Sequence, residues 1–202
     1  MILIRFYLLL TTVTLLQACT IAPSKPISSN SQLLQQEHLQ NLAQIKQFSL
    51  KGRIGIQSEG KGFSGGINWQ HETKQDEISL YSPLGGELLH INNTADKASL
   101  SDAQGNKITA DDVETLAAKV LGVQLPLNGL SDWALGRPIN SDILESTWDS
   151  QGRLIKIVQD GWLIEYQNYL PNNHISLPQK ITLRNDKIFV KIQVDEWKIS
   201  QI

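Results

Sequence analysis

The sequence of 202 residues predicts an α+β protein, mainly β, in which one large antiparallel sheet carries helices on one side. Two observations predict this fold. Apolar and polar residues alternate with a period of two through most of the chain after Phe48, in about ten or eleven short runs, and two or three stretches with helical spacing interrupt them. Alternation gives a sheet one apolar and one wet face, which antiparallel sheets allow and buried parallel sheets do not.

The chain begins with the features of an export signal. Arg5 gives the start a positive charge, and a mostly apolar stretch runs from Phe6 to Leu16. This stretch is too short to span a bilayer, which takes about 20 residues, so we predict a signal peptide over residues 1–18. A polar segment rich in Ser and Pro follows, and we predict that residues 19–30 form a flexible tether.

The single cysteine, Cys19, ends the apolar stretch. One cysteine excludes an internal disulfide and a multi-cysteine zinc site. The motif Leu16-Gln17-Ala18-Cys19 looks like a bacterial lipobox, in which the cysteine receives lipid and becomes the first residue; an ordinary signal peptide with an unused thiol is the alternative. Because two or more acyl chains anchor a protein stably whereas one does not, we expect Cys19 to hold the protein on a membrane permanently.

Residues 31–202 are predicted to form one domain, which begins with a helix. Ser31 is the expected N-cap, and Leu34, Leu42 and Ile45 share one face at helical spacing. After Ile45 the spacing of apolar residues changes to two, which predicts that the sheet begins there.

The first two predicted strands are joined by a Gly-containing turn at residues 58–62. Shorter strands follow at 78–81, 87–91 and 98–100. The apolar face of these strands is formed by Phe48, Leu50, Ile54, Phe63, Ile67, Trp69, Ile78, Leu80, Leu89 and Ile91.

The stretch Ser82-Pro83-Leu84-Gly85-Gly86 connects two of these strands. Pro at the second position and Gly at the fourth favour a type I turn, which places Leu84 at its tip, pointing away from the body. One exposed leucine is ordinary in a soluble protein. On a membrane-anchored protein, however, a tip leucine gains about 1.5 to 3 kcal/mol on entering an apolar phase.

Two further helices are predicted after the short strands. Residues 109–112 resemble a capping box and start an amphipathic helix that contains Val113 and Leu116. A short helix within residues 128–135 carries Trp133.

The last part of the chain returns to strands. The turn residues Asp160-Gly161 and Asn185-Asp186 predict two hairpins. Their predicted cross-strand pairs are Lys156–Glu165, Ile157–Ile164, Ile155–Tyr166, Ile181–Val190 and Leu183–Ile188.

The remaining motifs do not indicate catalysis or a metal site. Residues 62–66 match G-x-S-x-G around Ser64, but strand alternation runs through them, whereas a nucleophile elbow needs strand, turn and helix. The four histidines lack metal-ligand spacing and are expected at the surface or in strands. With 18 Lys and Arg against 20 Asp and Glu, no basic surplus indicates nucleic acid. We therefore expect no metal, no cofactor and no nucleic-acid partner.

Three stretches together resemble the LolB family, the outer-membrane lipoprotein receptors of the Lol sorting pathway in Gram-negative bacteria. They are residues 82–85, the stretch from Ala110 to Pro138, and the landmarks Gly161-Trp162, Leu177-Pro178 and Trp197. The resemblance covers essentially the whole mature chain. It implies an incomplete antiparallel β-barrel of about eleven strands, covered by helices and enclosing an apolar cavity.

The resemblance also implies a function without covalent chemistry, so we do not expect an enzyme. Family members accept lipoproteins from the soluble periplasmic carrier LolA and place them in the inner leaflet of the outer membrane. The implied partners are therefore a LolA-like carrier, lipoprotein acyl chains and that leaflet, met by a monomer anchored on the periplasmic side. Thr20 fits this destination, because the usual signal for retention in the inner membrane is Asp after the cysteine.

We assign lipidation to Cys19 and membrane insertion to the tip formed by Pro83, Leu84 and Gly85. The candidate lining of the acyl cavity is Phe48, Leu50, Ile54, Phe63, Ile67, Trp69, Ile78, Leu80, Leu89, Ile91, Val113, Leu116 and Trp133. Plain core packing is the alternative role for each of them. Two alternatives for the whole protein remain open: an assembly lipoprotein with a solid core that binds another protein, and a lipid-ester hydrolase that uses Ser64.

Overall fold

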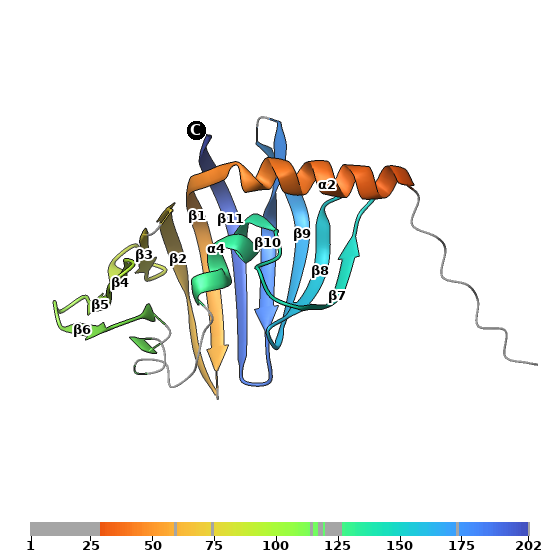
Figure 1. Ribbon diagram of the computed structural model, residues 1–202. Coiled ribbons are helices and arrows are strands. Elements are labelled where there is room, and N and C mark those ends of the chain that lie inside the picture. The colour runs from red at the N-terminus through yellow and green to blue at the C-terminus, as the bar shows by residue number, and fades with distance from the viewer. Residues whose placement is uncertain are drawn as a thin grey trace, which may run out of the picture.

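The computed structural model describes residues 29–58, 60–73, 75–113, 115–116, 119, 127–172 and 174–201. The predicted signal peptide and nearly all of the tether lie outside these residues. Within them lies one antiparallel sheet of eleven strands, accompanied by helices α2 (Ser29–Ala43) and α4 (Leu127–Leu135) (Figure 1). The strands are β1 (Ile45–Ser58), β2 (Lys61–Glu72), β3 (Gln75–Tyr81), β4 (Glu87–Asn93), β5 (Ala98–Asp102), β6 (Lys107–Ala110), β7 (Ile143–Trp148), β8 (Leu154–Gln159), β9 (Trp162–Asn172), β10 (Ile175–Arg184) and β11 (Ile188–Gln201). The predicted fold class and number of strands are confirmed.

The order of strands across the sheet is β6-β5-β4-β3-β2-β1-β11-β10-β9-β8-β7. The last strand pairs with the first, which joins the two halves of the chain into one sheet. β6 and β7 follow each other in the chain but lie at opposite edges, so the sheet is open. The segment between them therefore passes from one edge to the other, and α4 within it lies over the sheet and contacts β10 (Figure 1).

Alternation in β1 and β2 builds the centre of the sheet as predicted. Along β1, Leu50 and Ile54 are buried whereas Lys51 and Arg53 are exposed. Leu50 lies opposite Trp69 of β2 and opposite Trp197 of β11. One face of the sheet therefore collects the apolar side chains, and the other carries the charged ones.

The edge strands β6 and β7 were not predicted. Five of the six residues of β7 are exposed, so the strand shows no alternation of burial. Thr109, predicted to start a capping box, lies in β6, and the cap is Asp112, whose Oδ1 accepts a hydrogen bond of 2.6 Å from the backbone N–H of Thr115. Most of the predicted helix after Val113 lies outside the described residues.

The two predicted hairpins differ in outcome. The pairs Lys156–Glu165 and Ile157–Ile164 are confirmed, and the described ladder between β8 and β9 begins at Lys156. The predicted register of β10 and β11 is wrong by two residues, because Ile181 pairs with Ile192 and Leu183 with Val190.

The physical reason for this error is the side chain of Asn185. Its Oδ1 accepts hydrogen bonds from the backbone N–H groups of Lys187 (2.9 Å) and Ile188 (2.8 Å). The backbone N–H of Asn185 donates to the carbonyl of Ile188 at 3.0 Å. The turn is therefore centred on Asp186 and Lys187, one residue later than predicted, which shifts the register by two and keeps every side chain on its face.

Helix α2 crosses the ends of the strands on one side of the sheet (Figure 1). It includes Ser31, so this residue is not the N-cap, and Ile45, predicted to be helical, is the first residue of β1. The helix approaches the β7–β8 turn closely: a Cβ added to Gly152 would lie 2.4 Å from the backbone C of Leu34. With φ of +75°, this glycine lets the turn and the helix backbone meet.

Candidate functional site

The side chains predicted to line an acyl cavity lie on the apolar side of the sheet and its cover. Nine of the thirteen are buried, namely Phe48, Leu50, Ile54, Ile67, Trp69, Leu80, Val113, Leu116 and Trp133. The other four, Phe63, Ile78, Leu89 and Ile91, are half-buried and pack against them. Which of them contact a ligand remains a prediction.

The structure divides these residues between two apolar clusters. The larger one includes Trp133 of α4 and the residues of β1, β2 and β3. Val113 and Leu116 belong to a smaller cluster with Ala98, Leu100 and Ala110 at the β5–β6 edge. Leu89 of β4 packs against both clusters. The residues predicted to cover the sheet therefore lie over two parts of it: Trp133 over the first, and Val113 with Leu116 over the second.

An aromatic group closes the end of the apolar face where β1 begins. Phe48 lies edge-on to Trp69 and Trp197, with ring centroids 5.2 and 5.4 Å apart. It also stacks on His71 at 4.9 Å, and His71 Nδ1 is 2.7 Å from Asp76 Oδ1. Sequence reasoning missed Trp197 and His71 as parts of this face, although the alternation through Trp69 continues to His71.

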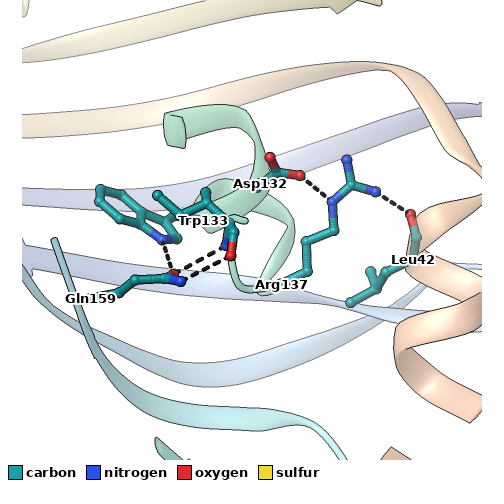
Figure 2. Close-up of polar contacts among 6 residues, drawn as sticks. Leu42, Asp132, Trp133, Arg137 and Gln159 are labelled. Carbon is teal, nitrogen blue, oxygen red and sulfur yellow. Dashed lines mark hydrogen bonds and ion pairs between the residues drawn. The ribbon is translucent and has the colours of Figure 1, made fainter. Parts of the chain in front are cut away.

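Polar contacts hold α4 to the sheet and to α2 (Figure 2). Trp133, fully buried, donates from its indole Nε1 to Oε1 of Gln159 at 3.1 Å. Arg137, just after α4, forms an ion pair with Asp132 and donates to the carbonyl of Leu42 at 2.7 Å. Leu42 lies in the last turn of α2, so Arg137 connects the two helices.

A second polar group lies where α2 meets the β7–β8 turn. Asp149 and Arg153 form an ion pair of 2.6 Å, and the Arg153 guanidinium lies 4.7 Å from the centre of the Tyr169 ring. His38 of α2 packs edge-on against the same ring at 6.4 Å and is buried, contrary to the expectation of a surface or strand position. The residues that bury His38 lie more than 100 positions later in the chain, so the local sequence does not predict its burial.

Burial and hydrogen bonds shift the pKa values of His38 and Asp149, and burial shifts that of the nearby Tyr166. Burial, followed by the charge of Arg153, lowers the pKa of His38, against the opposing effect of Asp149. Burial also raises the pKa of Asp149, but hydrogen bonds from Arg153 and Gln151 outweigh it and lower the pKa overall. Burial raises the pKa of Tyr166 far above its usual value. Within the described residues, His38 Nε2 and the Tyr166 hydroxyl are the buried polar atoms without a hydrogen-bond partner.

The chain forms a hydrogen-bonded turn at residues 82–86, as predicted. The backbone N–H of Gly85 donates to the carbonyl of Ser82 at 2.9 Å, and Gly85 has φ of +93°. A second bond of 2.8 Å, from Ser82 N–H to the Gly86 carbonyl, closes the base. Leu84 is 99% exposed at the tip, so its side chain contacts almost nothing in the protein.

A pocket of about 510 Å³ lies away from the predicted lining, between the tips of the β1–β2 and β10–β11 hairpins. Its wall is mixed and includes Ser58, Arg184, Asp186, Lys187 and Phe189. None of the thirteen candidate lining residues borders it.

The other sequence predictions concern Ser64 and Cys19. Ser64 is exposed in the middle of strand β2, where no strand–turn–helix elbow exists. Cys19 lies outside the described residues. Among the helices that the structure describes, none combines the length and the apolar character needed to cross a bilayer.

Comparisons with known proteins agree with this architecture. A solved structure of a DUF1329 family protein from Desulfovibrio piger, 7% identical, matches in fold with a TM-score of 0.51 over 88% of this chain and 94% of that one. A relative from Nitrosomonas europaea, named outer-membrane lipoprotein LolB, is 34% identical over 75% of this chain and 72% of its own length. Another of that name, from Haemophilus influenzae, is 31% identical over 96% and 97%. The family model described as outer membrane lipoprotein LolB matches residues 46–197, nearly the whole sheet from β1 to β11. This chain therefore belongs to the LolB family of outer-membrane lipoproteins.

Proposed function

We propose that this protein is a receptor that accepts lipoproteins from a LolA-like periplasmic carrier and inserts them into the inner leaflet of the outer membrane. Membership of the LolB family across the sheet is the observation that carries this proposal. The open sheet supports it, because its apolar face is covered by helices rather than by a second sheet. The lipid on Cys19 would hold the receptor on the periplasmic side of that membrane.

The physical basis of transfer is the cost of exposing acyl chains to water. Each CH₂ group exposed costs about 0.8 kcal/mol, so a lipoprotein crosses the periplasm only inside protein. A receptor takes over the chains if its apolar surface binds them better than the carrier does. It releases them if the bilayer binds them better still, and no nucleotide is required. The thirteen candidate lining residues provide the apolar surface in this scheme.

Leu84 supplies a step that the lining residues cannot perform. Its side chain points away from the protein and is held there by the bonds of the turn. It therefore acts after the acyl chains have been accepted, by entering the membrane where they are released. Pro83 and Gly85 contribute by fixing the turn that presents it.

The test separates acceptance from insertion. Lipidated wild-type protein and Leu84→Glu are given a radiolabelled lipoprotein bound to its carrier; capture is measured by co-purification and insertion by flotation with liposomes. A charge at the tip replaces a favourable partition of about 1.5 to 3 kcal/mol by an unfavourable one, so insertion should fall at least about tenfold. Capture should stay normal, because Leu84 is exposed and belongs to neither apolar cluster.

The matched control is Leu33→Glu, the same change at another exposed leucine, on α2. It should leave capture and insertion normal. If Leu84→Glu loses capture together with insertion, or retains both, the tip is only a turn. If the wild-type protein captures no lipoprotein, the receptor function itself is wrong.

A further inference from the structure

Gln159 is a fully buried polar side chain at the end of β8, beside the Asp160-Gly161 turn. Its Oε1 accepts hydrogen bonds from Trp133 Nε1 and from the backbone N–H of Ile139, both at 3.1 Å. Its Nε2 donates to the carbonyls of Ile139 at 2.9 Å and Ser141 at 3.0 Å. The two donors and the two lone pairs of the amide are therefore all used.

These four bonds fix α4 from two directions. Figure 2 shows the bond from Trp133. Trp133 lies in α4, and its indole N–H is a donor that must find an acceptor when buried. Ile139 lies in the segment that follows α4 and packs against its start, since a Cβ added to Gly129 would lie 2.8 Å from Ile139 Cγ2. One side chain from the sheet thus holds the last turn of α4 directly and its first turn through Ile139.

The position of Gln159 gives these contacts a role beyond packing. The chain between β6 and β7 passes from one edge of the open sheet to the other, and Gln159 holds it near its end. An apolar side chain of similar size would fill the space, but it would leave the Trp133 indole and the carbonyls of Ile139 and Ser141 without partners. The amide is the side chain that satisfies both the donors and the acceptors of this segment.

We propose that Gln159 is a positioning residue for lipoprotein binding, which fixes Trp133 and α4 as an immobile wall over the apolar face of the sheet. The inference rests on the proposed receptor function. Without these bonds α4 would lose its fixed place, and the apolar surface offered to an acyl chain would lose its shape.

Gln159→Glu tests this role, because its effect depends on pH. An ionised carboxylate has no hydrogen to donate and faces the carbonyls of Ile139 and Ser141. A protonated carboxyl donates to one of them and still accepts from Trp133 and the Ile139 N–H. Burial raises the pKa of such a carboxyl group. The carboxyl introduced by Gln159→Glu should therefore lose its proton at a higher pH than an exposed glutamate does.

Capture of a radiolabelled lipoprotein from its carrier is measured at about pH 5.5 and pH 8, always as the ratio of variant to wild type at the same pH. The ratio should be near one at the lower pH and fall about tenfold at the higher pH, where buried acceptors lose their donors. The ratio removes any effect of pH that the variant and the wild type share. Charged groups beside α4 and Gln159 include the Asp132–Arg137 pair and the exposed Asp142 and Asp160.

Hydrogen exchange of α4 in protein without lipoprotein gives a readout that does not depend on the receptor function. Backbone amides of residues 130–135 should exchange faster in Gln159→Glu at pH 8 than in the wild type, after correction for the intrinsic effect of pH, and equally at pH 5.5. Trp133→Phe keeps a ring but removes one of the four bonds, so it should weaken capture less than Gln159→Glu does at pH 8 and without dependence on pH.

A capture ratio that is the same at both pH values, or unchanged exchange in α4, overturns the proposal. A lowered melting temperature with normal capture by the folded variant also overturns it, because the role is then stability alone. Failure of the wild-type protein to capture lipoprotein refutes the receptor function instead, and the exchange experiment still decides whether Gln159 fixes α4.

Discussion

His38 is a residue at which burial and polarity oppose each other. Its ring packs against Tyr169 beneath α2, yet Nε2 has no hydrogen-bond partner among the described residues. An unsatisfied buried polar atom costs about 1 to 3 kcal/mol. Because burial lowers the pKa of His38 in the folded protein, the unfolded chain takes up its proton first as the pH falls. The free energy of unfolding therefore decreases as the pH falls below 6.5, the pKa of the histidine in the unfolded chain. The decrease ends when the pH has passed the lower pKa of His38 in the folded protein.

His38→Phe should remove this loss of stability. Phenylalanine keeps an aromatic ring against Tyr169, leaves no polar atom unsatisfied and does not titrate. The melting temperature, measured by calorimetry from about pH 7.5 down to pH 5, should fall less steeply in the variant than in the wild type. His174→Phe, at an exposed histidine, is the control and should follow the wild type. Parallel curves for His38→Phe and the wild type would show that His38 is not the group responsible.

Residues differ in how far the sequence predicts their surroundings, and Leu84 and His38 show the two extremes. The exposure of Leu84 follows from a Pro and a Gly beside it, because turn chemistry is local. The burial of His38 depends on Arg153 and Tyr169, which only the fold brings to α2. The four hydrogen bonds of Gln159 were not predicted for the same reason, since a glutamine at the end of a strand is normally exposed.

At the scale of elements, α2 rests on the sheet through few buried side chains. Within the described part of the helix, His38 and Leu42 are buried, whereas Leu33 is exposed. Two further contacts hold the backbone of α2, namely the bond from Arg137 to the Leu42 carbonyl and the close approach of Gly152. We therefore expect α2 to be easier to displace than α4.

Gly152→Ala should displace α2, and Gly161→Ala is its matched control. Both glycines have φ of +75°, but a Cβ at Gly161 would meet nothing within 4 Å, whereas one at Gly152 would meet the helix backbone. Alanine in this conformation costs about 1 to 2 kcal/mol by itself. Overpacking against α2 should add about 1 to 3 kcal/mol in Gly152→Ala alone. Denaturant unfolding measures the difference, and equal losses in the two variants would contradict the close approach.

Helices and strands could be predicted where apolar residues recur at a regular spacing in the sequence. The strands β1 to β5 show alternation because one of their faces carries the apolar side chains that pack in the two clusters, and their existence follows from the sequence. β7 was not predicted because five of its residues are exposed, so the strand has no buried face that would give an alternating pattern. The turn between β10 and β11 was misplaced by one residue because an asparagine side chain replaced a backbone acceptor.

At the scale of the whole molecule, we predict that membrane anchoring and lipoprotein binding belong to different parts of the chain. The lipid on Cys19 is the predicted anchor, and the folded domain binds the lipoprotein. Cys19→Ala should incorporate no labelled palmitate and should leave the membrane fraction, either uncleaved or as a soluble form. Thr20→Ala keeps the cysteine and should remain labelled. A domain that lacks residues 1–19 should still capture lipoprotein, because the sheet begins at Ile45. Undiminished labelling of Cys19→Ala would contradict the assignment of lipidation.

The open sheet also determines how much the interior can change in size. In a closed barrel, the number of strands and their stagger set the circumference, so widening breaks a ladder of hydrogen bonds. Here no ladder joins β6 to β7. The two edges can move apart or together by a small change of twist at each strand pair, with every backbone hydrogen bond kept. In a receptor for lipoproteins, such elasticity would let one scaffold accept cargoes whose chains differ in length and number.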